Sequence, residues 1–245
     1  MIEIITLGGI PEVQEGAHLD LLLADALQAA GLERRDGDIL VVTQKILSKA
    51  EGRMIRLDTV EPGAEALELA ELTYKDPRLV ELVLAESTAI VRAAPHVLIA
   101  RHRLGHVMAN AGIDRSNIGE GDTERALLLP VDPDASAAEL AQALGMPVVI
   151  SDSFGRPWRM GVVAVAIGAA GLPALLDRRG ERDRDGRALE VTQIAVADMI
   201  ATAACLVMGE GAEGVPAALV RGYHVEGPDA PAAALVRSEA EDLFR

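Results

Sequence analysis

Residues 148–159 (VVISDSFGRPWR) join a run of β-type apolar residues to an adjacent carboxylate and hydroxyl, Asp152 and Ser153. A strand that ends there would present both groups to a ligand, because ligands of α/β proteins bind at the carboxyl ends of strands. Gly155 then allows a tight turn, and the guanidinium group of Arg156 suits phosphate or carboxylate oxygens. A buried strand followed by an ordinary solvated turn would show the same pattern, so this segment alone leaves both interpretations open.

A second segment, residues 110–117 (NAGIDRSN), follows a predicted strand that contains Val107. Asp114 offers an oxygen ligand for a hard cation, and the amide of Asn117 can both donate and accept hydrogen bonds. The alternative is a plain loop, because asparagine and glycine tolerate the left-handed backbone conformation. The segment therefore supplies candidate ligands without proving a site.

The third segment, residues 208–215 (MGEGAEGV), matches the spacing G-x-G-x-x-G. A dinucleotide-binding fingerprint needs a strand before it and a helix after it, whereas here a helix is predicted before and a strand after. Glu210 and Glu213 would also repel a pyrophosphate. We therefore predict a glycine-rich backbone nest for a nucleotide, with Glu210 holding a divalent cation that neutralises the phosphates.

Asp114, Asp152 and Glu210 thus lie in glycine-bearing turns next to apolar segments. Mg²⁺ and Mn²⁺ bind few protein carboxylates and complete their coordination with water and phosphate oxygens, so three acids suffice for two ions on a triphosphate. His102 and His106 lie in strand-like sequence without a zinc-binding pattern, and we expect ordinary core or surface histidines.

Basic residues recur at every fourth position in residues 44–53 (QKILSKAEGR), at Lys45, Lys49 and Arg53. On a helix they would share one face. A solvated surface face is the usual meaning of such a stripe. In a chain this acidic, however, a basic run with no acid before Glu51 is less expected, so an anion-binding face stays open.

The composition is that of a globular protein with an aliphatic core, since 50% of its 245 residues are hydrophobic and only 2% are aromatic. A net charge of −15 and a pI near 4.7 argue against a nucleic-acid surface. The single cysteine, Cys205, excludes an internal disulfide and is expected to be a core thiol. No membrane span or secretion signal is evident. We expect a cytoplasmic protein with no membrane or nucleic-acid partner.

Helices and strands alternate without a fixed repeat. Strands are predicted at 2–6, 39–43, 89–94, 97–103, 107–111, 148–151, 162–169 and 217–221, and helices at 19–30, 64–73, 76–86, 136–144, 193–207 and 232–245. Asp76 is the predicted cap of its helix, with proline at the next position. The charged run at 176–190 is expected to be a solvated loop, with a mobile lid as the alternative.

Taken in order, the blocks GIPEVQEG, DGDILVVTQKILSKAEGR, KDPRLVELVLAES, NAGIDRSN, LLPVDPDASA, VVISDSFGRPWR, DGRALEVT, VADM and LVMGEGAEGVPAALVRG resemble the coenzyme F420-0:L-glutamate ligase family. The resemblance covers nearly the whole chain. It implies an α+β fold with mixed sheets and flanking helices, one domain over residues 1–245 with two interleaved lobes, and an intertwined homodimer. The nitroreductase-like extension found in some relatives, and its flavin mononucleotide, are not expected.

The resemblance also implies GTP-dependent addition of L-glutamate to coenzyme F420-0, followed by extension through γ-glutamyl links by way of an acyl phosphate. One divalent cation, Mn²⁺ or Mg²⁺, would be held by Asp114 and Asp152, and a second by Ser153 and Glu210, with K⁺ as a further cation. The implied nucleotide contacts are Ile10, Pro11, Glu12, Val13, Gln44, Lys45, Lys49, Asn117, Met208, Gly209, Glu210, Gly211, Ala212, Glu213, Gly214 and Val215.

Asp152 and Arg156 are the predicted catalytic residues, and Arg156 and Arg159 are assigned to anion contacts from their chemistry alone. Four positions depart from the family pattern: Gln44 and Lys45 replace small hydroxyl residues, Ser153 replaces threonine, and Met199 replaces an acid. The number of glutamates added and a preference for GTP over ATP stay open. The alternative functions are a metal-dependent nucleotide hydrolase, a ligase for another phosphorylated carboxylate, and a non-catalytic deazaflavin-binding protein.

Overall fold

The computed structural model describes residues 1–118 and 124–242. Its largest sheet has the strand order β1-β12-β2-β8-β9. Within it β2 and β8 are parallel, and the other neighbours are antiparallel. The strand bounds are β1 (Glu3–Leu7), β12 (Ala217–Arg221), β2 (Ile39–Thr43), β8 (Val148–Arg156) and β9 (Arg159–Ala170).

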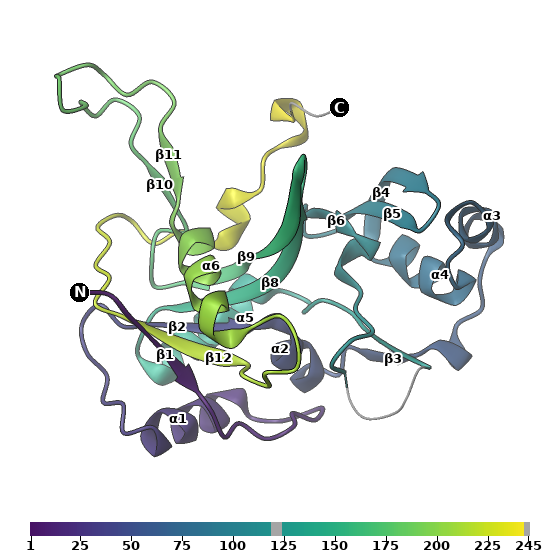
Figure 1. Cartoon of the computed structure of the whole chain (residues 1–245), viewed down its shortest axis with the longest axis horizontal. Helices are drawn as coiled ribbons and strands as arrows, with labels where there is room; N and C mark the ends of the chain where they lie inside the picture. The colour runs from purple at the N-terminus through teal and green to yellow at the C-terminus, as the bar shows by residue number, and fades with distance from the viewer. Residues whose placement is uncertain (119–123, 243–245) are drawn as a thin grey trace.

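Helices cover both faces of this sheet, because its central strands are apolar on both sides. In β2, Leu40 and Val42 pack against α1 (Leu19–Ala29), α2 (Gln44–Ala50) and α5 (Pro133–Leu144). Ile39 and Val41 face the other way, toward α6 (Val196–Met208), which crosses in front of the sheet in Figure 1. The chain is therefore a mixed α+β protein, as predicted.

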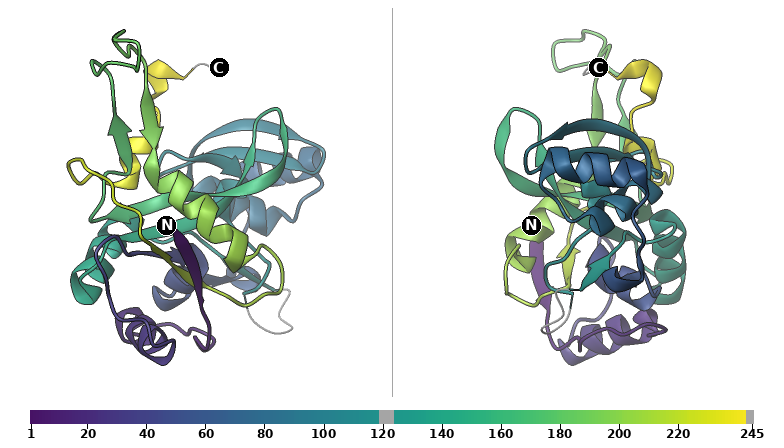
Figure 2. Two further views of the ribbon diagram at one scale, coloured as in Figure 1. Left: turned by 60° about the vertical axis from the view of Figure 1, so that its left-hand side comes forward. Right: turned by 90° about the vertical axis from the view of Figure 1, so that its right-hand side faces the viewer.

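A second group of elements lies to one side of the large sheet and has its own buried cluster around Leu57, Val80 and Val83. The right-hand view of Figure 2 looks onto it. It contains a two-stranded sheet, β3 with β7, and a three-stranded sheet, β4-β5-β6. Its elements are β3 (Met54–Arg56), η1 (Leu57–Thr59), α3 (Ala64–Thr73), α4 (Pro77–Ala85), β4 (Ser87–Ala94), β5 (Val97–His102), β6 (Val107–Ala109), η2 (Asn110–Gly112) and β7 (Arg125–Leu127).

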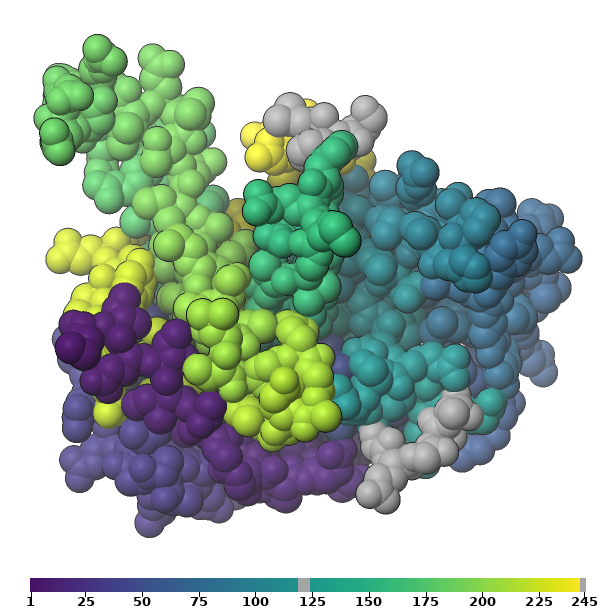
Figure 3. Space-filling view, viewed as in Figure 1, coloured from purple at the N-terminus to yellow at the C-terminus, as the bar shows by residue number. Residues whose placement is uncertain are grey.

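The prediction that a strand ends at Asp152 is wrong. Strand β8 continues to Arg156, and Gly155 pairs with Val162 inside the β8–β9 hairpin. The tight turn lies at residues 157–158, where Trp158 has the positive φ of 59°. Asp152 and Ser153 therefore lie within a β-hairpin, and the far end of this hairpin extends beyond the body of the protein (Figure 3).

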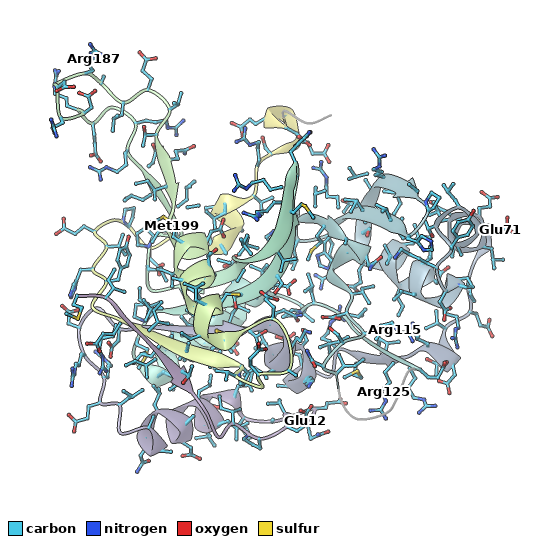
Figure 4. The ribbon with its side chains drawn as sticks, in the orientation of Figure 1. Glu12, Glu71, Arg115, Arg125, Arg187 and Met199 are labelled. Carbon is cyan, nitrogen blue, oxygen red and sulfur yellow. The ribbon has the colours of Figure 1, made fainter. Side chains whose placement is uncertain are left out.

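Residues 176–190 were predicted to be a loop, but Leu176 and Asp177 belong to strand β10 (Leu175–Asp177). The remaining residues lead to β11 (Gln193–Ala195), which pairs with β10 in a two-stranded arm. The arm projects from the body, with Arg187 at its far end (Figure 4). The prediction of a helix over 232–245 is wrong for the described residues, which form two short 3-10 turns, η3 (Ala232–Leu235) and η4 (Glu239–Glu241). Residues 243–245 lie outside the described residues.

Several local predictions are confirmed. Strand β2, helix α3 and strand β12 have the predicted bounds. The Asp76 carboxylate accepts a hydrogen bond from the backbone N–H of Arg78, with Pro77 at the first turn of α4. None of the helices in the described part of the chain has the length and apolar character needed to cross a membrane.

A buried ion cluster ties α4 to the loop after α2. Arg53 donates to Glu86 Oε2 at 2.8 Å, and His102 Nε2 and Arg103 Nε each lie 3.3 Å from that oxygen. Burial alone would raise the pKa of Glu86. The hydrogen bonds from His102 and Arg53, with the charges of Arg53 and Arg103, outweigh it and hold that pKa at about 2. Glu86 is therefore ionised wherever the protein is folded at ordinary pH.

We expect Glu86→Gln to lower the free energy of unfolding at neutral pH by about 2 kcal/mol, because two arginines lose their carboxylate partner. The pKa of Glu86 in the fold is below its ordinary value of 4.5. Its contribution is therefore complete above 4.5 and is lost as the pH falls toward 2. Urea denaturation of both proteins across this range measures the difference, which should shrink with acidity; a difference independent of pH would contradict the assignment.

Candidate functional site

A pocket of about 900 Å³ lies where α2, β6, η2, β8 and the loop after α6 meet. The three chemistry-bearing segments singled out from the sequence all contribute to it. The predicted site residues that line it are Ile10, Pro11, Glu12, Val13, Lys45, Lys49, Asp114, Asn117, Asp152, Ser153, Met208, Gly209, Glu210, Gly211, Ala212, Glu213, Gly214 and Val215. Three predicted residues, Gln44, Arg156 and Arg159, do not line it.

Lys45 and Lys49 extend from one face of α2 into the pocket. Lys45 Nζ lies 2.7 Å from Asp114 Oδ2, and Lys49 Nζ lies 2.5 Å from Glu12 Oε1. Only 8% of the Lys49 side chain is exposed, so the alternative of a solvated basic face is wrong. Arg53 lies beyond the end of the helix and belongs to the Glu86 cluster. Two ammonium groups in one pocket are a means of binding an anionic ligand.

Gln44 is buried at the start of α2, beneath the pocket surface, because it is the first helical residue after the buried strand β2. Its amide oxygen accepts a hydrogen bond from the Ser48 hydroxyl at 2.8 Å, and its side chain is close enough to Asp152 to lower the pKa of that carboxyl. Gln44 therefore lies behind the pocket surface, where a nucleotide contact was expected.

Asp152 carries the most perturbed carboxyl group of the site. Burial, together with the nearby charge of Asp114, raises its pKa to about 7. The backbone N–H of Ser153, the Lys45 ammonium and the Gln44 amide oppose this without cancelling it. By contrast, the pKa of Asp114 is lowered. Burial of Asp114 would raise this pKa, but the hydrogen bonds from Lys45 and Ser116 and the charge of Lys45 lower it by more. A positive ion beside Asp152 would relieve this unfavourable charge.

The other pair of oxygen donors is formed by Ser153 and Glu210. The Ser153 hydroxyl lies 2.5 Å from Glu210 Oε2, which brings two segments 57 residues apart in the sequence into direct contact. Carboxylate and hydroxyl oxygens are ligands for hard divalent cations. Among the described residues no group of three His, Cys, Asp or Glu side chains is assembled for a metal. Ser153 and Glu210 thus offer one pair of oxygen donors in the pocket, and Asp114 and Asp152 are two further carboxylates that line it.

Cys205 is partly buried and packs against the core cluster on α6, as its apolar neighbours predicted, but it also lines the pocket. It lies on the α6 face that lines the pocket, and its Sγ is 2.9 Å from Glu210 Oε1. Burial and the Glu210 carboxylate raise the pKa of the thiol to about 11. Cys205 is thus a protonated donor to Glu210, and helical periodicity could not reveal this because the contact depends on the loop that follows.

The glycine-rich loop runs from the end of α6 to β12, so the absence of a strand–loop–helix context is confirmed. Gly209 and Gly214 have φ values of 77° and 66°, which favour glycine. The Asn117 amide donates to the Gly211 carbonyl at 3.0 Å. This bond joins the glycine-rich loop to the segment that carries Asp114.

Arg156 lies outside the pocket because β8 continues past Asp152, and four further residues of strand carry it roughly 13 Å along the hairpin. Its guanidinium group donates to the Met160 carbonyl at 2.8 Å. Arg159 is exposed on the same hairpin. The structure therefore does not bring either arginine to Asp152.

His102 and His106 are ordinary interior histidines, as predicted. His102 is fully buried in the Glu86 cluster. The His106 ring meets Phe154 edge to face, with 5.6 Å between the ring centroids. Phe154 in turn lines the pocket, a role that the sequence analysis did not assign.

The chain is similar to known proteins of one family. A family model described as F420-0:Gamma-glutamyl ligase matches residues 9–222. A protein of Methanothermobacter thermautotrophicus named coenzyme F420:L-glutamate ligase is 46% identical, over 100% of this chain and 99% of its own. Proteins of the same name from Methanopyrus kandleri and Natronomonas pharaonis are 45% and 44% identical, over 96% and 100% of this chain and 94% and 95% of their own. The chain belongs to the F420-0:gamma-glutamyl ligase family.

Proposed function

We propose that this chain adds L-glutamate to coenzyme F420-0 with GTP as the energy source, and extends a γ-linked glutamate tail. Relatives that this chain matches over 99% and 94% of their own length are named coenzyme F420:L-glutamate ligase. The observation that carries the proposal is that two lysines and four oxygen-donor side chains from distant segments face one pocket. Phosphoryl transfer depends on such positioned charge.

In the proposed reaction, a carboxylate oxygen of the acceptor attacks the γ-phosphorus of GTP, and GDP leaves. The amine of glutamate then attacks the acyl carbon, phosphate leaves, and the nitrogen loses a proton. Asp114 and Asp152 would hold one divalent cation, Mn²⁺ or Mg²⁺, and Ser153 and Glu210 the other; when bound, these ions neutralise phosphate charge. K⁺ and the choice of GTP over ATP stay predictions.

The chain's own residues supply binding and orientation. Lys45 and Lys49 place their ammonium groups on the wall that the nucleotide phosphates would meet. Lys45 now pairs with Asp114, and with a cation held by Asp114 the Lys45 ammonium group would be available to a phosphate oxygen. The Cys205 thiol and the Ser153 hydroxyl hold the two oxygens of Glu210 in place.

We expect Lys49→Ala to raise the KM for GTP about tenfold with little change in the KM for glutamate, because one charge-assisted contact to phosphate is lost. Initial rates at varied GTP measure this. Lys75→Ala is the matched control, since Lys75 follows α3 and does not line the pocket. An unchanged KM for GTP in Lys49→Ala would remove Lys49 from the nucleotide site.

The acyl phosphate can be tested with an acceptor whose tail carboxylate carries ¹⁸O. The proposed reaction moves one labelled oxygen into phosphate for each amide bond formed. Mass spectrometry of the released phosphate measures this transfer. Glutamylation with unlabelled phosphate would contradict the proposed intermediate, and GTP hydrolysis without glutamylation would favour the hydrolase.

The proposed enzyme acts as a homodimer, a state implied by the family resemblance. Sedimentation equilibrium of the purified chain tests it. A mass of twice 25.8 kDa is the expected result, and a monomer that is fully active would contradict it.

A further inference from the structure

The turn that leads into Asp114 has an unusual backbone. Asn110, Ala111 and Gly112 have φ values of 51°, 52° and 72°, three consecutive residues in the left-handed region. Such a conformation is unfavourable for an alanine. It persists because both ends are fixed: β6 pairs with β5, and Asp114 exchanges backbone hydrogen bonds of 3.0 and 2.9 Å with Leu127. Strain held in this way concentrates at functional sites.

Asn110, the first residue of this turn, is one of the residues that line the pocket. Its Oδ1 atom is buried and has no hydrogen-bond partner, and among the described residues it is the one side-chain atom of this kind that belongs to a pocket-lining residue. An amide oxygen that is buried without a donor is costly. Neither lysine supplies that donor, since Lys45 is bonded to Asp114 and Ser116 and Lys49 to Glu12 and Asn117.

The wall around Asn110 differs from the nucleotide wall. It is formed by β6, η2 and β8, and its other contributions include the apolar side chains of Met108, Ile113 and Phe154. The candidate cation ligands adjoin this wall, since Asp152 belongs to β8 and Asp114 follows η2 in the chain. A ligand on this wall would therefore lie close to the carboxylates that are proposed to hold the cations of the reacting phosphate.

We propose that Asn110 is a substrate-positioning residue whose Oδ1 accepts a hydrogen bond from the amine of the incoming amino acid. The inference rests on the proposed function. An amide oxygen only accepts, so it suits an N–H donor and offers nothing to a carboxylate or a phosphate. Of the proposed reactants' reacting groups, the amine alone brings N–H donors to the acyl carbon. A hydrogen bond from one N–H leaves the nitrogen lone pair free to be aimed at that carbon.

The test uses Asn110→Gly, because glycine keeps the left-handed backbone without strain and removes only the amide. The KM for L-glutamate should rise about tenfold, while the KM for GTP stays within about twofold. Glutarate, which has both carboxylates and no amine, should inhibit the variant and the wild type equally. Asn110→Asp keeps an acceptor and tolerates the same backbone, so its KM for glutamate should stay near the wild-type value.

Hydroxylamine separates this proposal from the proposed function, because it traps an acyl phosphate without using an amino-acid site. The wild type and Asn110→Gly should form hydroxamate at similar rates in the presence of GTP. The role of Asn110 would be overturned if Asn110→Gly left the KM for glutamate unchanged. It would also be overturned if the substitution weakened inhibition by glutarate as much as it raised the KM for glutamate. If Asn110→Gly does not fold, a tenfold rise in the KM of Asn110→Asp overturns it instead. A wild type that yields neither hydroxamate nor glutamylated product would refute the proposed function itself.

Discussion

Replacing Asp152 with asparagine is expected to reduce glutamylation at least about a thousandfold. The change keeps the shape of the side chain and removes the negative charge that would hold a cation. The fold should be unharmed, because burial and the charge of Asp114 both disfavour the ionised form of Asp152. Initial rates at saturating GTP and Mn²⁺, together with the melting temperature, measure both effects.

Asp25→Asn is the matched control for this change, because Asp25 lies exposed on α1 and does not line the pocket. It should keep wild-type activity. Turnover by Asp152→Asn within about tenfold of the wild type would contradict the cation assignment. Substituting a residue that only orients a metal ligand already lowers activity by about that much, so the loss of a ligand itself should cost more.

Gly168→Ala is expected to lower the free energy of unfolding by roughly 3 kcal/mol. A Cβ on Gly168 of β9 would collide with the backbone carbonyl of Pro133, at the start of α5. The clash is with main chain, which cannot rotate away, and α5 is also tied to β9 by the bond from Ala169 N–H to Asp134. The melting temperature should fall by about 8 °C.

Gly155→Ala is the matched control within the same hairpin. No atom outside its immediate chain neighbours lies within 4 Å of the Cβ that alanine would add there, and its φ is not positive. Its melting temperature should equal that of the wild type. A melting temperature of Gly168→Ala equal to that of the wild type would contradict the close packing of α5 on β9.

Elements whose signal is local could be predicted from the sequence. Strand β2 is an unbroken apolar run, and helix α4 begins with an aspartate cap followed by proline, so neither depends on distant contacts. The β8–β9 hairpin could not be read in this way. A glycine at 155 suggests a turn, yet pairing with β9 overrides that preference and extends the strand.

The candidate site follows the same division. Asp114, Asp152 and Glu210 were recognisable because acids in glycine-bearing segments have few structural roles there. Arg156 and Gln44 were misplaced, since the direction of a side chain is set by tertiary packing rather than by residue type. Cys205 became recognisable as a pocket residue only when the loop after α6 brought Glu210 back to it.

The central claim is that this chain joins L-glutamate to coenzyme F420-0 at the expense of GTP. Mass spectrometry of the deazaflavin after incubation with L-glutamate, GTP and Mn²⁺ tests it most directly. The account predicts product masses that increase by whole glutamyl units, with one GDP formed for each unit. A coenzyme of unchanged mass, with GTP either intact or merely hydrolysed, would contradict it.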